Sequence, residues 1–490
     1  MEFVNPLSFL KDKTILVTGA TGFLGKVFVE KILRIQPNVK KMYLLVRATN
    51  AKSAMKRILD EVYVEKDLFN VQRDIFGANF KSFISEKVVA VAGDVSEVNL
   101  GVQDSKLMEE LYKEIDLVVN SAATTDFDER YDFSFNVNTM GALNVMSFAK
   151  NCIKINMVLH VSTAYVCGEG SGLIPEKPFY NGETLKCTCR LEITEEKKLI
   201  DEKLNQLQAQ GAAKNELTST MKELGIQRAR FYGWPNTYVF TKAMGEMILG
   251  KYRDNLPLVI VRPTIITSTF AEPFPGWTEG LRTIDGPIAG YGKGKLTFLL
   301  ANPKAICDMM PVDMVVNSMI MAMTANTRQS SQIIYHIGSS MRNPIKMTNV
   351  HKFARQYFIE HPLINKAGKP IKVCKGTLFK TTASFYTYMR IRYVMPLKVL
   401  KLISVFDKKY KDVCIGHGKK IKFAMRLVDL YKPYMLFKGI FDDTNSQKLR
   451  MKVGKSGLVD AFNFDPKSID WEDYIINTHI VGLVKYVLKG

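Results

Sequence analysis

The chain has 490 residues, of which 47% are hydrophobic and 24% are charged, a composition typical of a globular protein with room for two or three domains. Seven cysteines do not make a disulfide framework in so long a chain, so free thiols in a reducing compartment are expected. No run of about 18 apolar residues occurs, which excludes a predicted membrane-spanning helix. With a first strand beginning by Thr14, neither a secretory signal nor a cleavable plastid transit peptide is expected, and the predicted location is intracellular.

The net charge of +20 is unevenly distributed. Residues 361–490 contain 25 lysines and arginines against 10 aspartates and glutamates, a net charge of +15 in the last quarter of the chain. Such an asymmetry indicates an anionic partner: a phosphate-rich substrate, a phospholipid surface or nucleic acid. No nucleic-acid recognition motif accompanies the charge, so nucleic acid is not expected.

An apolar run followed by three glycines near the N-terminus predicts a dinucleotide-binding turn. Residues 14–18 read TILVT, and glycines follow at intervals of three before a segment with helical periodicity. In this motif one glycine allows the tight turn, one lets the backbone approach the pyrophosphate, and one lets the helix pack closely on the sheet. The helix N-terminus then faces the phosphates. The cofactor contacts expected here are Gly19, Thr21, Gly22, Phe23, Leu24 and Gly25.

Further apolar runs alternate with helix-type segments, which predicts a Rossmann-type, doubly wound parallel sheet with its site at the carboxyl ends of the strands. The additional strands are expected at residues 41–46, 87–95, 115–123, 157–166, 259–264 and 333–337. Asn138 is expected to begin a helix that ends near Asn151. His160 lies inside an apolar strand and is interpreted as a core residue rather than a catalyst.

Polar residues at the strand ends are candidates for contacts with the cofactor. Arg47 takes the place where many dinucleotide folds have an acid, so it favours the 2′-phosphate of NADPH; the alternative is a solvated arginine. Asp94 either bonds the adenine amino group or caps the next turn. Asn120 ends a strand whose small neighbours leave space for the cofactor, and it is a further candidate contact.

Three regions depart from this alternation. Residues 183–230 predict a helical insertion of one or two amphipathic helices, either covering the site or forming a surface appendage. Residues 273–295, rich in glycine and proline, are expected to be a loop along a substrate channel. Beyond residue 369 a basic, mainly helical domain is expected, with a helix at 396–406 that has Pro396 in its first position and lysines such as Lys408 and Lys409 after it. Cys187-x-Cys189 lacks a second ligand pair, so no metal site is expected.

Tyr238 and Lys242 form a Tyr-x-x-x-Lys pair on one face of a helix that Pro235 and Asn236 introduce. A phenol has an ordinary pKa near 10. An ammonium one turn away, together with the positive nicotinamide, is expected to lower that pKa and make the phenol an acid–base group. A hydroxyl must also bond the substrate oxygen, and Thr163 or Ser162 at a strand end suits this role.

These motifs together resemble the extended short-chain dehydrogenase/reductase superfamily and, more narrowly, the plant-type alcohol-forming fatty acyl-CoA reductases. The resemblance rests on GATGFLG at residues 19–25, HVSTAY at 160–165, GWPNTYVFTK at 233–242 and the basic C-terminal region of male-sterility type. It implies that Tyr238 and Lys242 are catalytic, that the hydroxyl is Thr163 with Ser162 as the alternative, and that the glycine turn and Lys242 bind NADPH. It also implies a catalytic domain at 1–368 and a reductase-specific domain at 369–490.

The resemblance further implies NADPH-dependent reduction of a long-chain or very-long-chain fatty acyl-CoA to a primary alcohol through an enzyme-held aldehyde. The basic region then has three interpretations: a site for coenzyme A phosphates, a surface that lies on an anionic membrane such as the endoplasmic reticulum, or a packed helix with a solvated face. The alternative functions are another extended-family oxidoreductase or epimerase, and a non-catalytic dinucleotide-binding scaffold. Oligomeric state is not encoded in any motif.

Overall fold

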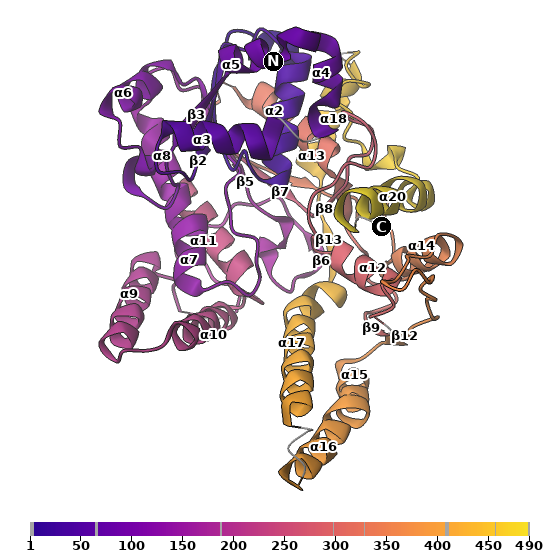
Figure 1. Ribbon diagram of the computed structural model, residues 1–490. Coiled ribbons are helices and arrows are strands. Elements are labelled where there is room, and N and C mark those ends of the chain that lie inside the picture. The colour runs from indigo at the N-terminus through magenta and orange to yellow at the C-terminus, as the bar shows by residue number, and fades with distance from the viewer. Residues whose placement is uncertain are drawn as a thin grey trace.

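The computed structural model describes residues 4–63, 67–186, 189–296, 298–327, 329–406, 411–455 and 457–488. A seven-stranded parallel sheet forms its centre (Figure 1). In order across the sheet the strands are β11 (Gln332–Ile337), β7 (Leu258–Pro263), β5 (Met157–Val161), β4 (Leu117–Asn120), β1 (Thr14–Thr18), β2 (Lys41–Val46) and β3 (Val88–Ala92). The direction of winding reverses between β1 and β4, where a crevice opens at the carboxyl ends. The predicted doubly wound sheet is confirmed.

Helices cover both faces of the sheet, which explains why its central strands read as continuous apolar runs rather than alternating ones. Ile15 and Val17 point into a core shared with α2 (Phe23–Ile35) and α13 (Val312–Asn326). Leu16 points into the opposite core, with α8 (Gly141–Asn151) and α6 (Ser105–Glu114). Shorter helices complete the N-terminal half: α1 (Pro6–Leu10), α3 (Ala51–Ile58), α4 (Asn70–Phe76) and α5 (Phe80–Lys87).

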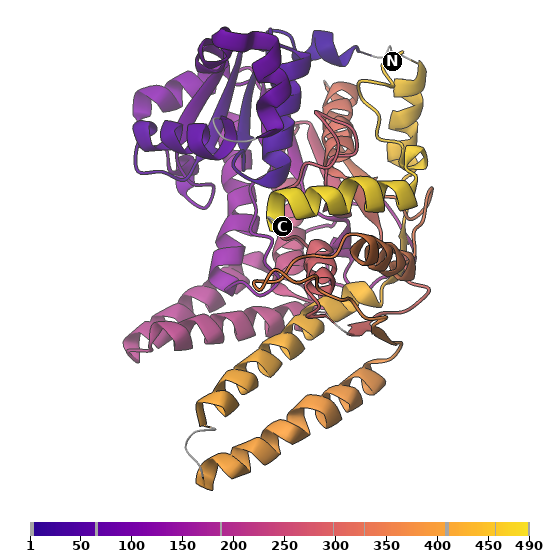
Figure 2. The same ribbon diagram turned by 45° about the vertical axis from the view of Figure 1, so that its right-hand side comes forward.

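The predicted helical insertion consists of two helices, α9 (Ile193–Ala209) and α10 (Lys214–Tyr232). They pack on α7 (Tyr131–Phe135) and α11 (Thr237–Tyr252), in an apolar core of their own. Buried Glu196 fixes this packing, because it accepts a hydrogen bond from the Tyr131 hydroxyl at 2.7 Å and pairs with Arg228. The insertion projects from the side of the body in both ribbon views (Figures 1 and 2).

Two local predictions are wrong. Part of the expected loop at 273–295 is a helix, α12 (Asp285–Gly292), because Ile288 and Tyr291 are buried against α14 (Met347–Glu360), and this packing outweighs the low helix propensity of glycine. Asn138 does not begin a helix, since the helix runs from Tyr131 through a π-helical segment (Asn136–Met140) into α8. Asp132 and Ser134 are polar but buried, and Phe133 is apolar but exposed, so the helical period is hidden there.

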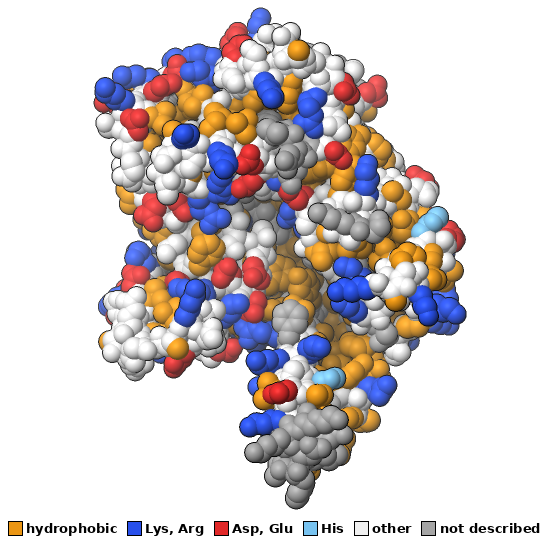
Figure 3. All heavy atoms as spheres, in the orientation of Figure 1, with side chains coloured by type: hydrophobic (Ala, Val, Ile, Leu, Met, Phe, Trp, Pro, Cys, Tyr) orange, Lys and Arg blue, Asp and Glu red, His pale blue; other side chains and the backbone are white. Residues whose placement is uncertain are grey.

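A helical arm leaves the body and returns to it (Figure 2). Its outgoing half is α15 (Thr382–Met389), a π-helical turn (Arg390–Val394) and α16 (Met395–Phe406), and its returning half is α17 (Lys411–Met435). Pro396 is therefore the second residue of α16 and not its first. Proline donates no backbone hydrogen bond, and the π turn before it tolerates this missing bond. Basic and hydrophobic side chains are both exposed along this arm (Figure 3).

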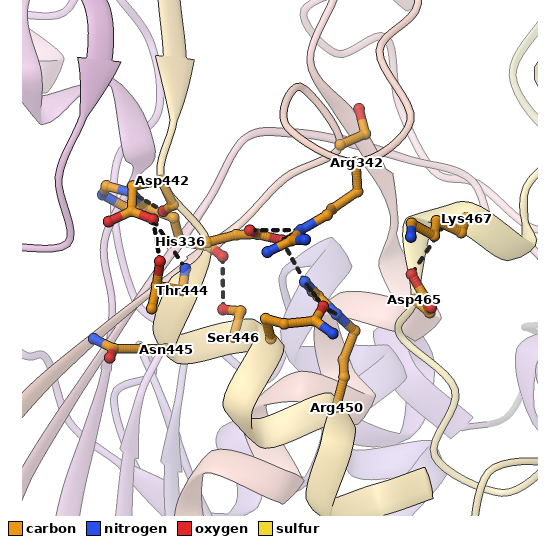
Figure 4. A network of polar contacts seen from close by, with 12 residues as sticks. His336, Arg342, Asp442, Thr444, Asn445, Ser446, Arg450, Asp465 and Lys467 are labelled. Carbon is orange, nitrogen blue, oxygen red and sulfur yellow. Dashed lines mark hydrogen bonds and ion pairs between the residues drawn. The ribbon is translucent and has the colours of Figure 1, made fainter.

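After the arm, the chain packs against the sheet. Strand β13 (Lys438–Phe441) pairs with β6 (Ser171–Ile174), and α18 (Thr444–Lys455) lies beside β11. The Ser446 hydroxyl donates to the His336 carbonyl at 2.8 Å, and Asp443 accepts from both Arg342 and Arg450 (Figure 4). The remaining elements are β8 (Ile265–Thr267) paired with β10 (Met309–Pro311), β9 (Phe298–Leu300) paired with β12 (Thr377–Phe379), and the terminal helices α19 (Trp471–Asp473) and α20 (Ile480–Leu483). The division into domains at 368/369 stays a prediction. Strands from its two sides pair with each other, β12 with β9 and β13 with β6.

Six described cysteines are free: Cys152, Cys167, Cys189, Cys307, Cys374 and Cys414. Among the described helices, none combines the length and the apolar character needed to cross a membrane. Cys187, Lys408 and Lys409, which the sequence analysis singled out, lie outside the described residues.

Candidate active site

A cavity of about 500 Å³ opens at the carboxyl ends of β1, β4 and β5, at the point where the sheet reverses direction. Its walls come from the β1–α2 turn, the ends of β4 and β5, helix α11, two tyrosines of α17, and residues 125–127, 263–266 and 281–283. Most of the predicted site residues line it: Gly19, Gly22, Phe23, Leu24, Gly25, Ser162, Thr163, Tyr238 and Lys242. The fold thus brings residues more than 200 positions apart in the sequence into one cavity.

The glycine turn has the shape that a dinucleotide requires. Gly19 has φ +74°, and a Cβ there would lie 2.7 Å from the backbone nitrogen of Ala122. A Cβ on Gly25 would overlap the carbonyl of Gly19, so only glycine lets α2 approach the turn this closely. Gly22 is the N-cap of α2 and provides no side-chain cap, which leaves the first amide groups of the helix for a phosphate. Thr21 belongs to the turn but does not line the cavity.

Beneath the cavity, Thr18, Asn120 and His160 are neighbours in register on β1, β4 and β5. The Thr18 hydroxyl accepts from the Ala122 amide at 3.1 Å and donates to the Asn120 side-chain oxygen at 2.8 Å. This orients the Asn120 amide nitrogen toward His160 Nδ1, 3.0 Å away. Because Nδ1 accepts, the neutral imidazole carries its hydrogen on Nε2. Asn120 is therefore a buried support of the site and not part of the cavity lining.

Lys242 lies at the end of this chain. Its Nζ is 3.2 Å from His160 Nε2 and donates to the Val161 carbonyl at 2.7 Å, and its side chain is almost completely buried. Burial lowers the pKa of Lys242 to about 8, and it lowers the pKa of His160 well below its ordinary value. With this pKa the lysine is protonated below about pH 8 and neutral above it.

Tyr238 stands one helical turn before Lys242 and is half-buried at the cavity wall. Burial raises the pKa of Tyr238 to about 12, and hydrogen bonding to Thr163 offsets part of that rise. The expected lowering by Lys242 is thus wrong for the cofactor-free protein, because the lysine is directed to His160 and Val161 instead. A phenol with a raised pKa stays protonated near neutral pH and is suited to donate a proton rather than to accept one.

Both candidate hydroxyls line the cavity, but their surroundings differ. Thr163 caps a short 3₁₀ turn, accepting from the Tyr165 amide at 3.3 Å, and it also bonds Tyr238. The Ser162 hydroxyl is buried and has no hydrogen-bond partner among the described residues. A buried polar group without a partner is costly, so this hydroxyl fits a site that a ligand completes.

Two further predicted cofactor contacts, besides Thr21 and Asn120, lie outside the lining. Arg47 is exposed at the end of β2, where its carbonyl accepts from Arg57 Nη1 at 2.7 Å. Asp94 accepts from the amide of Ser96 at 2.9 Å and from its hydroxyl at 2.8 Å, which is the turn-capping alternative. Contacts of Arg47 with a 2′-phosphate and of Asp94 with adenine stay predictions.

The sequence analysis missed the outer wall of the cavity. Phe127 stacks on Tyr238 with ring centroids 5.7 Å apart, and it also contacts Tyr431 and Tyr434 from α17. Tyr434 accepts a hydrogen bond of 2.7 Å from Asn236, the N-cap of α11. The spacing of the two tyrosines on one helix face is the only sequence signal for this wall. None of the described residues of the 183–230 insertion lines the cavity, which makes it an appendage beside the site.

Arg282 is a further lining residue that the sequence did not predict. Its guanidinium lies over the Phe23 ring, 4.5 Å from the centroid, at the start of α2. A cation beside a helix N-terminus adds to the positive field that favours phosphate. It comes from the stretch that the sequence analysis treated as a loop along a substrate channel.

Comparisons with known proteins show the family of the chain. Two family models, both described as male sterility protein and the first of them NAD-binding, match residues 17–319 and 392–490. "Probable fatty acyl-CoA reductase 4" of Arabidopsis thaliana is 56% identical over 99% of each chain, and "Alcohol-forming fatty acyl-CoA reductase" of Simmondsia chinensis is 51% identical over 100% of each. The reductase domain of a nonribosomal peptide synthetase from Mycobacterium tuberculosis has a TM-score of 0.58 at 19% identity, covering 98% of this chain and 93% of that one, which shows a common fold. The chain, with its nicotinamide-dinucleotide-binding domain, belongs to the fatty acyl-CoA reductase family.

Proposed function

We propose that the protein reduces long-chain or very-long-chain fatty acyl-CoA to a primary alcohol, with NADPH as the reductant and an aldehyde that stays bound between two reductions. The observation that carries the proposal is the convergence of Tyr238, Thr163 and Lys242 with the glycine turn in one cavity. The full-length similarity to a relative named as alcohol-forming supports the same reaction.

The residues present fit NADPH. The glycine turn and the uncapped start of α2 would hold the pyrophosphate, with Arg282 beside them, and Lys242 would hold the nicotinamide ribose. Arg47, which ends β2 in place of an acid, would pair with the 2′-phosphate and favour NADPH over NADH. When bound, the cofactor supplies the hydride.

Tyr238 and Thr163 act on the carbonyl oxygen of the thioester. As the carbonyl carbon takes up the hydride, the Thr163 hydroxyl donates a hydrogen bond to the developing oxyanion and the Tyr238 phenol donates its proton. The resulting hemithioacetal breaks its carbon–sulfur bond, which releases coenzyme A as the thiol and leaves an aldehyde. A second hydride and a second proton through Tyr238 convert the aldehyde to the alcohol, so each alcohol consumes two NADPH and two protons. Hydride attacks the thioester directly, and no cysteine nucleophile is needed.

The division of labour proposed for the chain assigns residues 1–368 to cofactor binding and catalysis and residues 369–490 to handling of the acyl substrate. The position of Tyr431 and Tyr434 against Phe127 and the Tyr238 ring supports a role for the second part at the site itself. An aromatic wall excludes water from the bound aldehyde and retains the aldehyde in the site for the second reduction.

We also propose that the helical arm lies on an anionic membrane surface, where acyl substrates accumulate. Ile391, Met395, Val399 and Leu402 repeat every three or four residues along its outgoing half and are each at least half exposed. Basic residues accompany them, and residues 390–402 contain no acid. An exposed apolar stripe within a basic helix is typical of interfacial binding. Val399→Asp should weaken co-sedimentation with phosphatidylserine vesicles, while equal co-sedimentation of the variant and the parent protein would contradict this role.

The test of the reaction supplies the purified protein with NADPH and acyl-CoA substrates from palmitoyl- to docosanoyl-CoA. NADPH absorbance, released thiol and extracted lipid are followed together, with the Tyr238→Phe variant as the control. Fatty alcohol and free thiol should appear as NADPH is consumed, and the variant should form neither. Binding of NADPH without any consumption would favour a dinucleotide-binding scaffold, and turnover of sugar nucleotides or hydroxysteroids in place of acyl-CoA would favour another extended-family enzyme.

A further inference from the structure

A second cavity, of about 330 Å³, lies between α12, α14, the paired strands β9 and β12, and the end of α17. Its lining is mainly apolar and includes Ile288, Tyr291, Leu296, Val350, Ala354 and Met435. None of the described residues that line it is acidic, and few of its exposed atoms are polar. A concave apolar surface of this kind is suited to hydrocarbon rather than to the amides of a pantetheine chain.

This second cavity adjoins the catalytic one. In two separate segments, one residue lines the catalytic cavity and the next residue in the chain lines the second cavity. Thr283 lines the catalytic cavity and Ile284 lines the second. On the returning helix of the arm, Tyr434 lines the catalytic cavity and Met435 lines the second. The two cavities therefore share a wall, and Met435 gives that wall a flexible, unbranched side chain that repacks easily.

We propose that the second cavity takes the distal part of the substrate's acyl chain, and so sets the chain length that the enzyme prefers. The inference rests on the proposed reduction of acyl-CoA, since it places the thioester at Tyr238 and directs the chain past Ile284 and Met435. If a methylene takes about the 30 Å³ that a water molecule occupies in the liquid, a cavity of about 330 Å³ holds roughly ten carbons. A longer chain fills more of this cavity, so palmitoyl and longer chains are expected to depend on it more than a decanoyl chain does.

Exposed charged groups in the lining limit how much hydrocarbon this cavity can bury. Lys352, Arg355 and Lys375 belong to its lining and are exposed to solvent. Hydrocarbon that extends past the apolar lining would meet these charged groups and water, so each further methylene contributes no burial. The preference is therefore expected to rise with length and then to level off, rather than to rise without limit.

The experiment narrows the cavity and compares chain lengths. Ala354→Phe on α14 places a ring in the apolar lining, and Ile359→Phe on the same helix adds its ring at an exposed position outside the cavity. Each buried methylene contributes about fourfold in affinity, so a ring that displaces about three of them should lower kcat/KM for stearoyl-CoA by roughly 50-fold. Decanoyl-CoA turnover and NADPH affinity should stay within about twofold, and Ile359→Phe should leave the whole profile unchanged.

Two further measurements guard against a merely unstable variant. Val350→Ala enlarges the cavity and should move the chain length at which the preference levels off toward docosanoyl-CoA. Equilibrium binding of S-hexadecyl-CoA, a thioether that cannot be reduced, should weaken in Ala354→Phe without change in NADPH binding. Equal losses at every chain length, or unchanged thioether affinity, would overturn the assignment of this cavity. Failure of the proposed reaction is distinguishable, because then the wild-type protein would reduce no acyl-CoA at any length while the thioether measurement would still test the cavity.

Discussion

Replacement of Gly25 by alanine tests how the first turn of α2 holds the cofactor. A Cβ on Gly25 would overlap the Gly19 carbonyl oxygen, and it would lie 2.9 Å from the Gly19 carbonyl carbon and 3.0 Å from Ala20 Cα. Ordinary contact begins at 3.4 Å, so α2 must withdraw by about half an ångström measured from that carbon, and by more measured from the oxygen. These neighbours are backbone atoms of the phosphate-binding turn, so no change of side-chain rotamer can relieve the overlap. The strain should cost about 1–3 kcal/mol of unfolding free energy.

The same displacement should weaken NADPH binding, because it changes the positions of the amide groups of the turn relative to those at the start of α2. Misplacement by about 1 Å typically costs on the order of 100-fold in rate, so a loss of tenfold or more in NADPH affinity is expected, read by titration of intrinsic fluorescence. Gly454→Ala in α18 is the matched control, since a Cβ there meets nothing within 4 Å. That variant should bind NADPH normally and gain about 0.5–1 kcal/mol of stability. Normal NADPH affinity in Gly25→Ala would refute the reasoning.

Four other variants test separate parts of the account. Tyr238→Phe should abolish alcohol formation with NADPH affinity near normal, and comparable turnover in a steady-state assay would remove the phenol as proton donor. Arg47→Ala should weaken NADPH much more than NADH in equilibrium titrations, whereas equal losses would contradict the 2′-phosphate contact. Burial lowers the pKa of Lys242 to about 8, so this side chain is protonated below that pH and neutral above it. The affinity for the anionic NADPH should therefore fall between pH 7 and pH 9. This fall in affinity should be absent in Lys242→Met. Arg262→Met leaves Glu246 buried without its partner and should cost about 3–5 kcal/mol in a denaturant titration, where a loss below 1 kcal/mol would argue against the pair.

Local patterns in the sequence were enough to predict the sheet and the inner half of the site. Continuous β-branched runs mark strands buried on both faces, and the glycine triplet has one structural use between a strand and a helix. Tyr238 and Lys242 follow from helical spacing alone, and the strand-end hydroxyls from their position. These features depend on residues close together in the chain, which is why they are readable without a structure.

The outer half of the site depends on contacts between distant segments. Tyr434 reaches the cavity only because α17 returns from the arm to the N-cap of α11 at Asn236. α12 forms in a glycine-rich stretch because α14 packs over it, and the local sequence contains no signal that predicts this contact. The pKa of Tyr238 also depends on distant contacts: helical spacing places Lys242 nearby, but His160 and the Val161 carbonyl decide where its amine points.

The central claim is that hydride passes twice to the same carbon, first in a thioester and then in an aldehyde. The most direct measurement supplies palmitoyl-CoA with NADPH deuterated at the transferred position of C4, followed by mass spectrometry of the extracted lipid. The expected product is hexadecanol with two deuterium atoms at C1, with one thiol released per alcohol. Unlabelled or singly labelled alcohol, or aldehyde as the only reduced product, would contradict it.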